Sequence, residues 1–155
     1  MSNVRDWVKE AVTKEMEETG SVPLKAVLVR GDSEVIPVLF AGLNKEQVYQ
    51  ALKRVVRDVD PDVVYVISES WVVTANKDIP NEEADLIVPS EHPDRVEVVV
   101  IQELTPTGTC FMRADIEEVS GRRCIGEFEE IDVPYSLMKG PLADIFPEEK
   151  KIRAS

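Results

Sequence analysis

The chain is poor in the residues that build many common functional sites. Its 155 residues include one histidine, two cysteines and seven glycines. The single histidine, His92, excludes any site that needs two imidazoles from one chain, and two cysteines exclude a disulfide framework and a four-cysteine zinc site. Neither a glycine-rich phosphate-binding motif nor the Gly-x-Ser-x-Gly motif of hydrolases is present. With so few cysteines, we expect a reducing, cytoplasmic location.

Long hydrophobic runs are also missing. A transmembrane helix needs about 20 apolar residues, whereas the runs here are as short as strands, for example residues 98–101. Charged residues stand near the N-terminus where a signal peptide has its apolar segment, so we expect neither a membrane span nor a signal peptide. The net charge of −12 argues against direct binding to nucleic acid or anionic membranes, because both are polyanions.

The patterns that are present predict one α+β domain over residues 1–146, followed by a charged tail over 147–155. Apolar residues at helical spacing predict an N-terminal helix over 3–18, and Asn44 with Gln47 opens a crossover helix over 45–58 with a capping-box pattern. A short C-terminal helix is expected over 135–146. The expected sheet is mainly antiparallel, with about six strands: 24–30, 34–40, 63–74, 94–104, 109–119 and 123–132.

Two positions in this sheet follow from single residues and turns. Pro37 donates no backbone hydrogen bond, which predicts an edge strand at 34–40, whereas the apolar strand 63–74 is expected in the centre. Three-residue loops at 106–108 and 120–122 would place Leu104 opposite Cys110 and Val98 opposite Ile116. This register gathers the apolar residues on one face, on which the helices would pack, and separates Cys110 from Cys124 by roughly 25 Å. We therefore predict two free, mostly buried thiols.

Polar residues interrupt the central strand at Ser68-Glu69-Ser70-Trp71. A buried polar group costs on the order of 1–3 kcal/mol unless it is paired, so these residues need a local reason. One interpretation is a carboxylate site at Glu69 with Trp71 as a stacking wall. The alternative is structural: Glu69 pairs with Arg95 or Arg113, and Trp71 belongs to the core.

A second unusual segment, Pro89-Ser90-Glu91-His92-Pro93-Asp94-Arg95, presents His92 between two prolines. His92 could act as a base, or as a metal ligand together with Glu91, Asp94 or Glu69. The alternative is a polar turn with a solvated imidazole. If the two segments meet, the predicted candidate site comprises Glu69, Ser70, Trp71, Ser90, His92 and Arg95.

The same two segments, Ser-Glu-Ser-Trp and Pro-Ser-Glu-His-Pro-Asp-Arg-Val-Glu, carry a resemblance that covers residues 68–97. The chain resembles small uncharacterised prokaryotic or phage-type proteins with Ser-Glu-x-Trp and Pro-Ser-x-His-Pro-x-Arg segments. The resemblance implies that the two segments belong together, and it implies no activity, fold or ligand.

These observations leave two main hypotheses of function. The first is a small soluble acidic binding or oligomerisation module without a cofactor, whose partner is another protein or a second copy of the chain. Trp7 on the first helix would then be a dimer anchor, or else a core residue. The second is a small metal-assisted hydrolase that uses Glu69, His92 and a divalent cation. A third hypothesis is an acidic mimic that occupies a nucleic-acid-binding partner.

The acidity is uneven along the chain. Residues 81–132 hold 14 acidic residues and 4 arginines. In the register above, Arg113 lies opposite Glu129, and this outer face is either solvated, or meets a basic partner or collects divalent cations. The carboxylates expected on the face opposite the core are Glu97, Glu103, Asp115, Glu117, Glu127 and Glu129.

Overall fold

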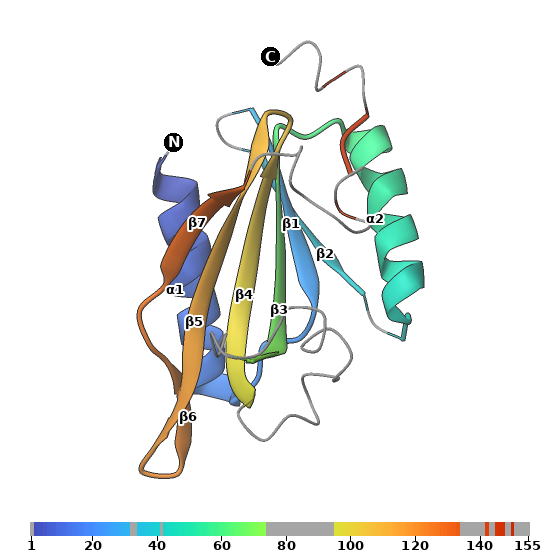
Figure 1. The fold of residues 1–155 in the computed structure, drawn as a ribbon. Helices are drawn as coiled ribbons and strands as arrows, with labels where there is room; N and C mark the ends of the chain where they lie inside the picture. Colours follow the sequence, from blue (N-terminus) through green and yellow to red (C-terminus); the bar gives the residue numbers. More distant parts are fainter. Residues whose placement is uncertain are drawn as a thin grey trace.

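The computed structural model describes residues 2–31, 34–40, 42–73, 95–133, 142, 145–147 and 150, and it gives the backbone alone for residues 2–3, 45, 70–73 and 95. Its elements run α1 (Ser2–Thr19), β1 (Lys25–Arg30), β2 (Glu34–Leu39), α2 (Lys45–Val59), β3 (Val63–Val73), β4 (Arg95–Thr105), β5 (Gly108–Val119), β6 (Arg122–Ile125) and β7 (Glu129–Val133). The strands form one antiparallel sheet in the order β2-β1-β3-β4-β5-β6, and β7 also pairs with β5 (Figure 1). The predicted α+β class is confirmed.

Local signals in the sequence placed the first half of the chain well. The Asn44 side chain accepts from the Gln47 backbone N–H at 2.9 Å, and the Gln47 side chain accepts from the Asn44 N–H at 3.1 Å. This capping box begins α2, and Asp60, at a φ of 54°, ends it. Strand β2, which contains Pro37, lies at the sheet edge as predicted, and β3 lies inside the sheet between β1 and β4.

The expectation that the helices share one face of the sheet was wrong. Helix α1 covers one face and helix α2 the other. Strands β1, β3 and β4 are apolar on both faces, so each face needs its own cover. The core on the α1 side includes Val8, Val12, Met16, Val27, Val29, Tyr65, Ile67, Val99, Ile101, Cys110 and Met112. The core on the α2 side includes Ala26, Leu28, Leu52, Val56, Val64, Val66, Leu104, Leu142, Ile145 and Phe146.

The predicted register of β4 against β5 was wrong by one residue. Thr105 pairs with Gly108, so the connecting turn has two residues instead of three. Leu104 therefore lies opposite Thr109, and Val98 lies opposite Asp115. Side chains alternate between faces along a strand, so a slip of one residue moves every β4 side chain to the other face relative to β5. Val98 and Ile116 consequently lie on opposite faces of the sheet.

The second turn also has two residues, and a bulge follows it. Ser120 and Gly121 have φ values of 53° and 78°, as a type I′ hairpin turn requires, and Val119 pairs with Arg122. The Gly126 N–H donates to the Asp115 carbonyl at 3.0 Å between β6 and β7. This interruption splits the predicted strand 123–132 in two, which is why the sheet has seven strands instead of about six.

Only parts of the C-terminal region are described. The predicted helix over 135–146 falls mostly outside the described residues; among the residues of that range that are described, Leu142 lies in a 3₁₀ turn. Leu142, Ile145 and Phe146 pack into the core on the α2 side. The predicted domain boundary at residue 147 stays a prediction. Cys110 and Cys124 are both free thiols, the first buried and the second half-buried. Neither described helix is long and apolar enough to cross a membrane.

Candidate functional site

The predicted site around Glu69 is described only in part. Ser90 and His92 lie outside the described residues, so whether they approach Glu69 stays a prediction. Ser70 and Trp71 on β3, and Arg95 at the start of β4, are described by their backbone alone. Glu69 is the one member of the predicted set whose side chain can be placed.

Glu69 is held in an ion-pair cluster on the α1 side of the sheet. Arg123 Nη2 lies 2.8 Å from Glu69 Oε1 and 2.5 Å from Glu97 Oε1, and Arg123 Nη1 donates to the Gly20 carbonyl at 2.5 Å. The second oxygen of Glu69 accepts from the Val22 N–H at 3.3 Å. This arrangement anchors the segment between α1 and β1 to the sheet.

The cluster favours the structural alternative for Glu69. An arginine neutralises the carboxylate, as that alternative requires, but the arginine is Arg123 instead of Arg95 or Arg113. A carboxylate that already accepts from a guanidinium and a backbone N–H is poorly placed to act as a base. Arg123, which lies on β6, was not among the predicted partners.

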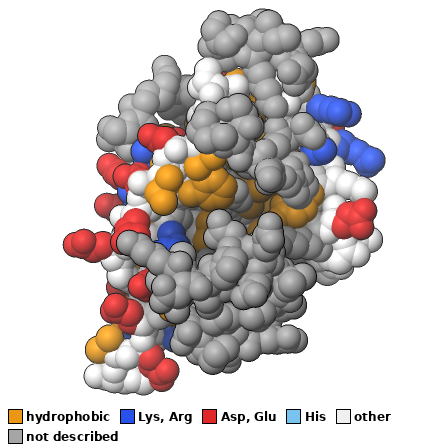
Figure 2. All heavy atoms as spheres, viewed as in Figure 1, with side chains coloured by type: hydrophobic (Ala, Val, Ile, Leu, Met, Phe, Trp, Pro, Cys, Tyr) orange, Lys and Arg blue, Asp and Glu red, His pale blue; other side chains and the backbone are white. Residues whose placement is uncertain are grey.

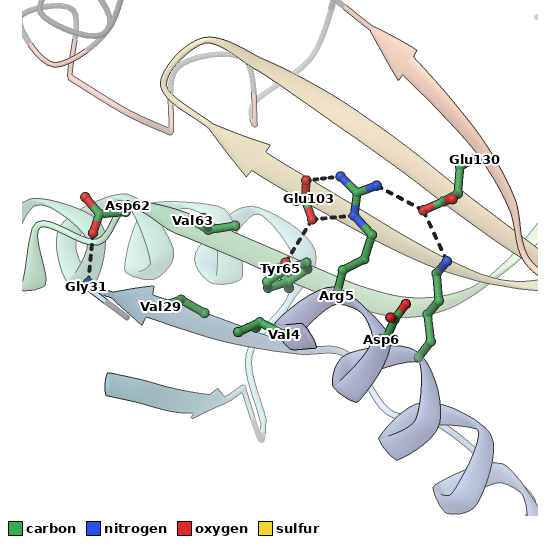
Figure 3. A pocket seen from close by; sticks show the side chains of 11 residues that line it. Val4, Arg5, Asp6, Val29, Gly31, Asp62, Val63, Tyr65, Glu103 and Glu130 are labelled. Atoms are coloured by element: carbon green, nitrogen blue, oxygen red, sulfur yellow. Dashed lines mark hydrogen bonds and ion pairs between the residues drawn. The ribbon is translucent and has the colours of Figure 1, made fainter. Parts of the chain in front are cut away.

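A different part of the α1 side contains a pocket that the described residues line. It measures about 610 Å³ and lies between the first turns of α1 and the facing parts of β1, β3, β4 and β7 (Figure 3). Apolar side chains occupy its middle, and charged groups stand toward its two ends. Its lining residues are Val4, Arg5, Asp6, Lys9, Val29, Gly31, Asp62, Val63, Tyr65, Glu103 and Glu130.

A buried carboxylate, Glu103 of β4, organises one end of this pocket. Arg5 grips it with two parallel bonds, from Nη2 to Oε1 at 2.5 Å and from Nε to Oε2 at 2.8 Å. The Tyr65 hydroxyl donates to Oε2 at 2.8 Å. Only 12% of the Glu103 side chain is exposed. Because three donors converge on it, this buried charge is fully paired.

The pKa values around Glu103 follow from that pairing. Burial alone would raise the pKa of Glu103, but hydrogen bonds from Arg5 and Tyr65 outweigh it and hold the pKa below its usual range. Burial and the bond to Glu103 raise the pKa of Tyr65, and the bond to Glu103 raises that of Arg5. At neutral pH the end of the pocket therefore holds a carboxylate, a guanidinium and a neutral phenol. Perturbed groups that line a pocket mark a candidate functional site.

The remaining charges leave the pocket with an excess of carboxylates. Arg5 Nη1 and Lys9 Nζ lie 3.2 Å and 3.1 Å from Glu130 Oε1, which neutralises that side chain as well. Asp62, at the far end, accepts from the Gly31 N–H at 2.8 Å and lies 4.0 Å from Lys150. Within the described part of the chain, Asp6 makes no hydrogen bond or ion pair. The lining has four carboxylates and two cationic side chains.

Cys110 of β5 pairs with Glu103 of β4. It lines a second pocket of about 350 Å³. Burial, followed by a hydrogen bond with Asp132, raises the pKa of the Cys110 thiol to about 11. The thiol is therefore protonated at neutral pH, whereas a nucleophilic cysteine needs its thiolate. Cys110 is therefore a buried core residue on the α1 side.

The acidic outer face is smaller than predicted. Glu97 and Glu103 lie on the α1 side, because the true register moves them there. The other four predicted carboxylates, Asp115, Glu117, Glu127 and Glu129, line a shallow depression with Arg113. Arg113 does pair with Glu129, at 3.7 Å. Figure 2 shows acidic side chains gathered over the side formed by β5, β6 and β7, and basic ones on the side of α2.

The described residues contain no group of three or more histidine, cysteine or acidic side chains arranged to hold a metal ion. The divalent cation of the hydrolase hypothesis thus has no site among them, and the segment with His92 lies outside them.

Comparison with known proteins gives no relative from which a role could be inferred. No protein-family model matches the chain, no curated protein is significantly similar to it, and no solved structure matches its fold.

Proposed function

We propose that the protein is a binding module, and that its pocket at Tyr65 receives an organic cation with an aliphatic body. The observation that carries the proposal is the charge pattern of the 610 Å³ pocket. Val4, Val29 and Val63 provide apolar walls, and carboxylates stand at both ends. Small-molecule sites combine apolar walls with a few placed polar groups in this way.

The sign of the ligand's charge follows from which charged side chains of the pocket are already paired. Arg5 and Lys9 are engaged with Glu103 and Glu130, so an anion would find its donors occupied. Asp6, in contrast, has no partner in the described part of the chain. The net charge of −12 also raises the concentration of cations near the molecule.

Binding of n-pentylamine tests the proposal, with n-pentanol as the neutral probe and pentanoate as the anionic one. Titration of the isotope-labelled protein, followed by NMR, should shift the amides of Gly31 and Val63 with the amine at about millimolar concentrations. We expect binding of the amine to be several times tighter than that of the alcohol and to weaken with added salt, because part of the affinity is electrostatic. Equal or tighter binding of pentanoate would refute the proposal.

Two variants locate the ligand. Asp6→Asn should weaken binding of n-pentylamine and leave binding of n-pentanol unchanged. Asp115→Asn, a matched change outside the pocket, should affect binding of neither probe. Val63→Phe should fill the pocket and prevent binding of both probes. The thermal midpoint of each variant shows whether it is folded, and the comparison of the three probes on the unaltered chain needs no variant.

A further inference from the structure

An open apolar strip runs from the pocket along the edge of the sheet. In the pairing of β1 with β2, Val35, Pro37 and Leu39 lie opposite Val29, Val27 and Lys25. Val27 and Val29 belong to the core on the α1 side, so the three β2 residues face that side too. They are nevertheless exposed, Leu39 to 73% and Val35 to 38%. Helix α1 leaves this outermost strand uncovered.

Helix α1 contributes the other half of the strip. Trp7 is 50% exposed, so the alternative that it is a core residue was wrong. Together with Ala11 and Pro37 it lines a hollow of about 200 Å³ between α1 and the sheet. We call Trp7, Ala11, Val35, Pro37 and Leu39 the α1–β2 surface. A contiguous patch of exposed apolar side chains is typical of an interaction site, whereas single exposed residues are ordinary.

The α1–β2 surface and the pocket are continuous. Val29 lines the pocket and pairs directly with Val35 of the surface. Resting on the function proposed above, we propose that the occupant is a segment of a partner protein. It lays apolar side chains on the α1–β2 surface and inserts a lysine or arginine side chain into the pocket. The stem of such a side chain fits the valine walls, and its charged head complements the carboxylates.

Charge selects this occupant over a second copy of the chain. Glu10 stands one turn from Trp7 on the solvent side of α1, and Glu17 follows about two turns farther along that side. Neither makes an ion pair in the part of the chain that the structure describes. A second copy would bring the same carboxylates and the same net charge of −12 to the interface, and like charges brought together oppose association. A basic segment brings the opposite charge.

A synthetic peptide, acetyl-Lys-Ser-Leu-Ser-Leu-Ser-Leu-amide, which in an extended conformation presents its lysine and leucines on one face, tests the inference by calorimetry. Replacing its lysine by norleucine should weaken binding at least about fivefold, and replacing its leucines by serine should do the same. On the protein, Trp7→Ser and Leu39→Ser should each raise the dissociation constant of the peptide at least about fivefold. Each should leave the dissociation constant of n-pentylamine within about twofold of that of the unaltered protein. Val119→Ser and Ile131→Ser, which alter exposed apolar residues elsewhere, are the matched controls and should change neither.

The possible outcomes separate the two proposals. If n-pentylamine binds but Trp7→Ser and Leu39→Ser leave the peptide unaffected, the docking inference is wrong and the proposed function stands. If neither n-pentylamine nor the peptide binds, both are wrong. If sedimentation shows a dimer that Trp7→Ser dissociates, the occupant is a second copy and the inference is overturned.

Discussion

The two faces of the sheet are built by different means. On the α2 side an apolar core joins α2, the sheet and the C-terminal region, and the buried Thr109 donates its hydroxyl to the Val133 carbonyl. On the α1 side an apolar core is interrupted by charges: Arg5 with Glu103, Lys9 with Glu130, Lys25 with Glu15, and Arg123 with two carboxylates. Polar contacts of α2 lie at its C-terminal end, where Lys150 pairs with Asp60 and Arg30 donates to the Val59 carbonyl. On the α1 side, in contrast, paired charges lie within the packed interface between the helix and the sheet.

The difference has a consequence for where ligands can bind. Burial is non-directional, so the apolar core on the α2 side requires no particular pairing of groups. Paired charges fix a geometry instead, and the grip of Arg5 on Glu103 sets the first turns of α1 against the sheet beside the pocket. Buried pairs of this kind add little net stability but set one arrangement, which is our hypothesis for this interface.

The largest expected effect comes from opening the α2 side. Leu52 is fully buried beneath α2, and Leu52→Ala should lower the free energy of unfolding by about 2–5 kcal/mol, through lost burial and a remaining cavity. Urea titration followed by circular dichroism measures this change. Arg54→Ala, an exposed change on the same helix, should cost less than about 0.5 kcal/mol. A similar loss in both variants would mean that α2 is not held by burial.

A smaller effect is expected when a charge is removed on the α1 side. Glu103→Gln keeps the shape of the side chain but removes the charge that Arg5 and Tyr65 bind, and it should cost about 1–3 kcal/mol. Arg5 is one-third exposed, so water screens part of the loss. In a double-mutant cycle with Arg5→Gln, measured by urea titration, the two changes should be coupled, because each leaves the other group unpaired. Additive losses would contradict the description of the pair as one unit.

The Glu103→Gln variant also distinguishes the two faces by the pH dependence of stability. The pKa of Glu103 is lower in the folded state than in the unfolded chain, where it is about 4.3. Its contribution is therefore fully present above that pH and is lost as the pH falls through the folded value. Between pH 6 and pH 3 the unaltered protein should lose more stability than Glu103→Gln, whereas Leu52→Ala should follow the unaltered protein. Glu129→Gln is the control at an exposed carboxylate. If the free energy of unfolding of Glu103→Gln fell with pH in parallel with that of the unaltered protein, Glu103 would not contribute to acid unfolding.

The two faces also differ in how well the sequence predicted them. Helix α2, its cap at Asn44 and the edge position of Pro37 depend on signals within a few residues, which a sequence shows directly. The network on the α1 side depends on the register of β4 with β5, and that register depends on one turn. The Thr105 hydroxyl donates to the Gly108 carbonyl at 3.0 Å and helps to close a two-residue turn, whereas the prediction had counted three residues.

The error in that turn explains most of what was missed in the site. It moved Glu103 to the solvent side, away from Arg5, which is 98 residues distant along the chain. Tyr65 and Glu103 are directly paired across β3 and β4. A tyrosine and a glutamate within largely apolar strands were the signal that could have found the pair. The prediction gave its attention to Glu69 instead, and the structure shows there an ion pair with Arg123.

The smallest expected effect concerns local opening of the two helices, and Cys110 reports it. Cys110 is 3% exposed and belongs to the core on the α1 side. In a Cys124→Ser background, labelling of Cys110 by iodoacetamide requires that this face opens. Val12→Ala and Val56→Ala are matched deletions beneath α1 and α2 respectively. If the faces open independently, Val12→Ala should accelerate labelling roughly threefold more than Val56→Ala under conditions where global unfolding is negligible. Because the pKa of Cys110 is raised to about 11, all rates must be compared at one pH. Mass spectrometry of timed samples gives the rates, and equal acceleration by both deletions would show that the two faces open together as one unit.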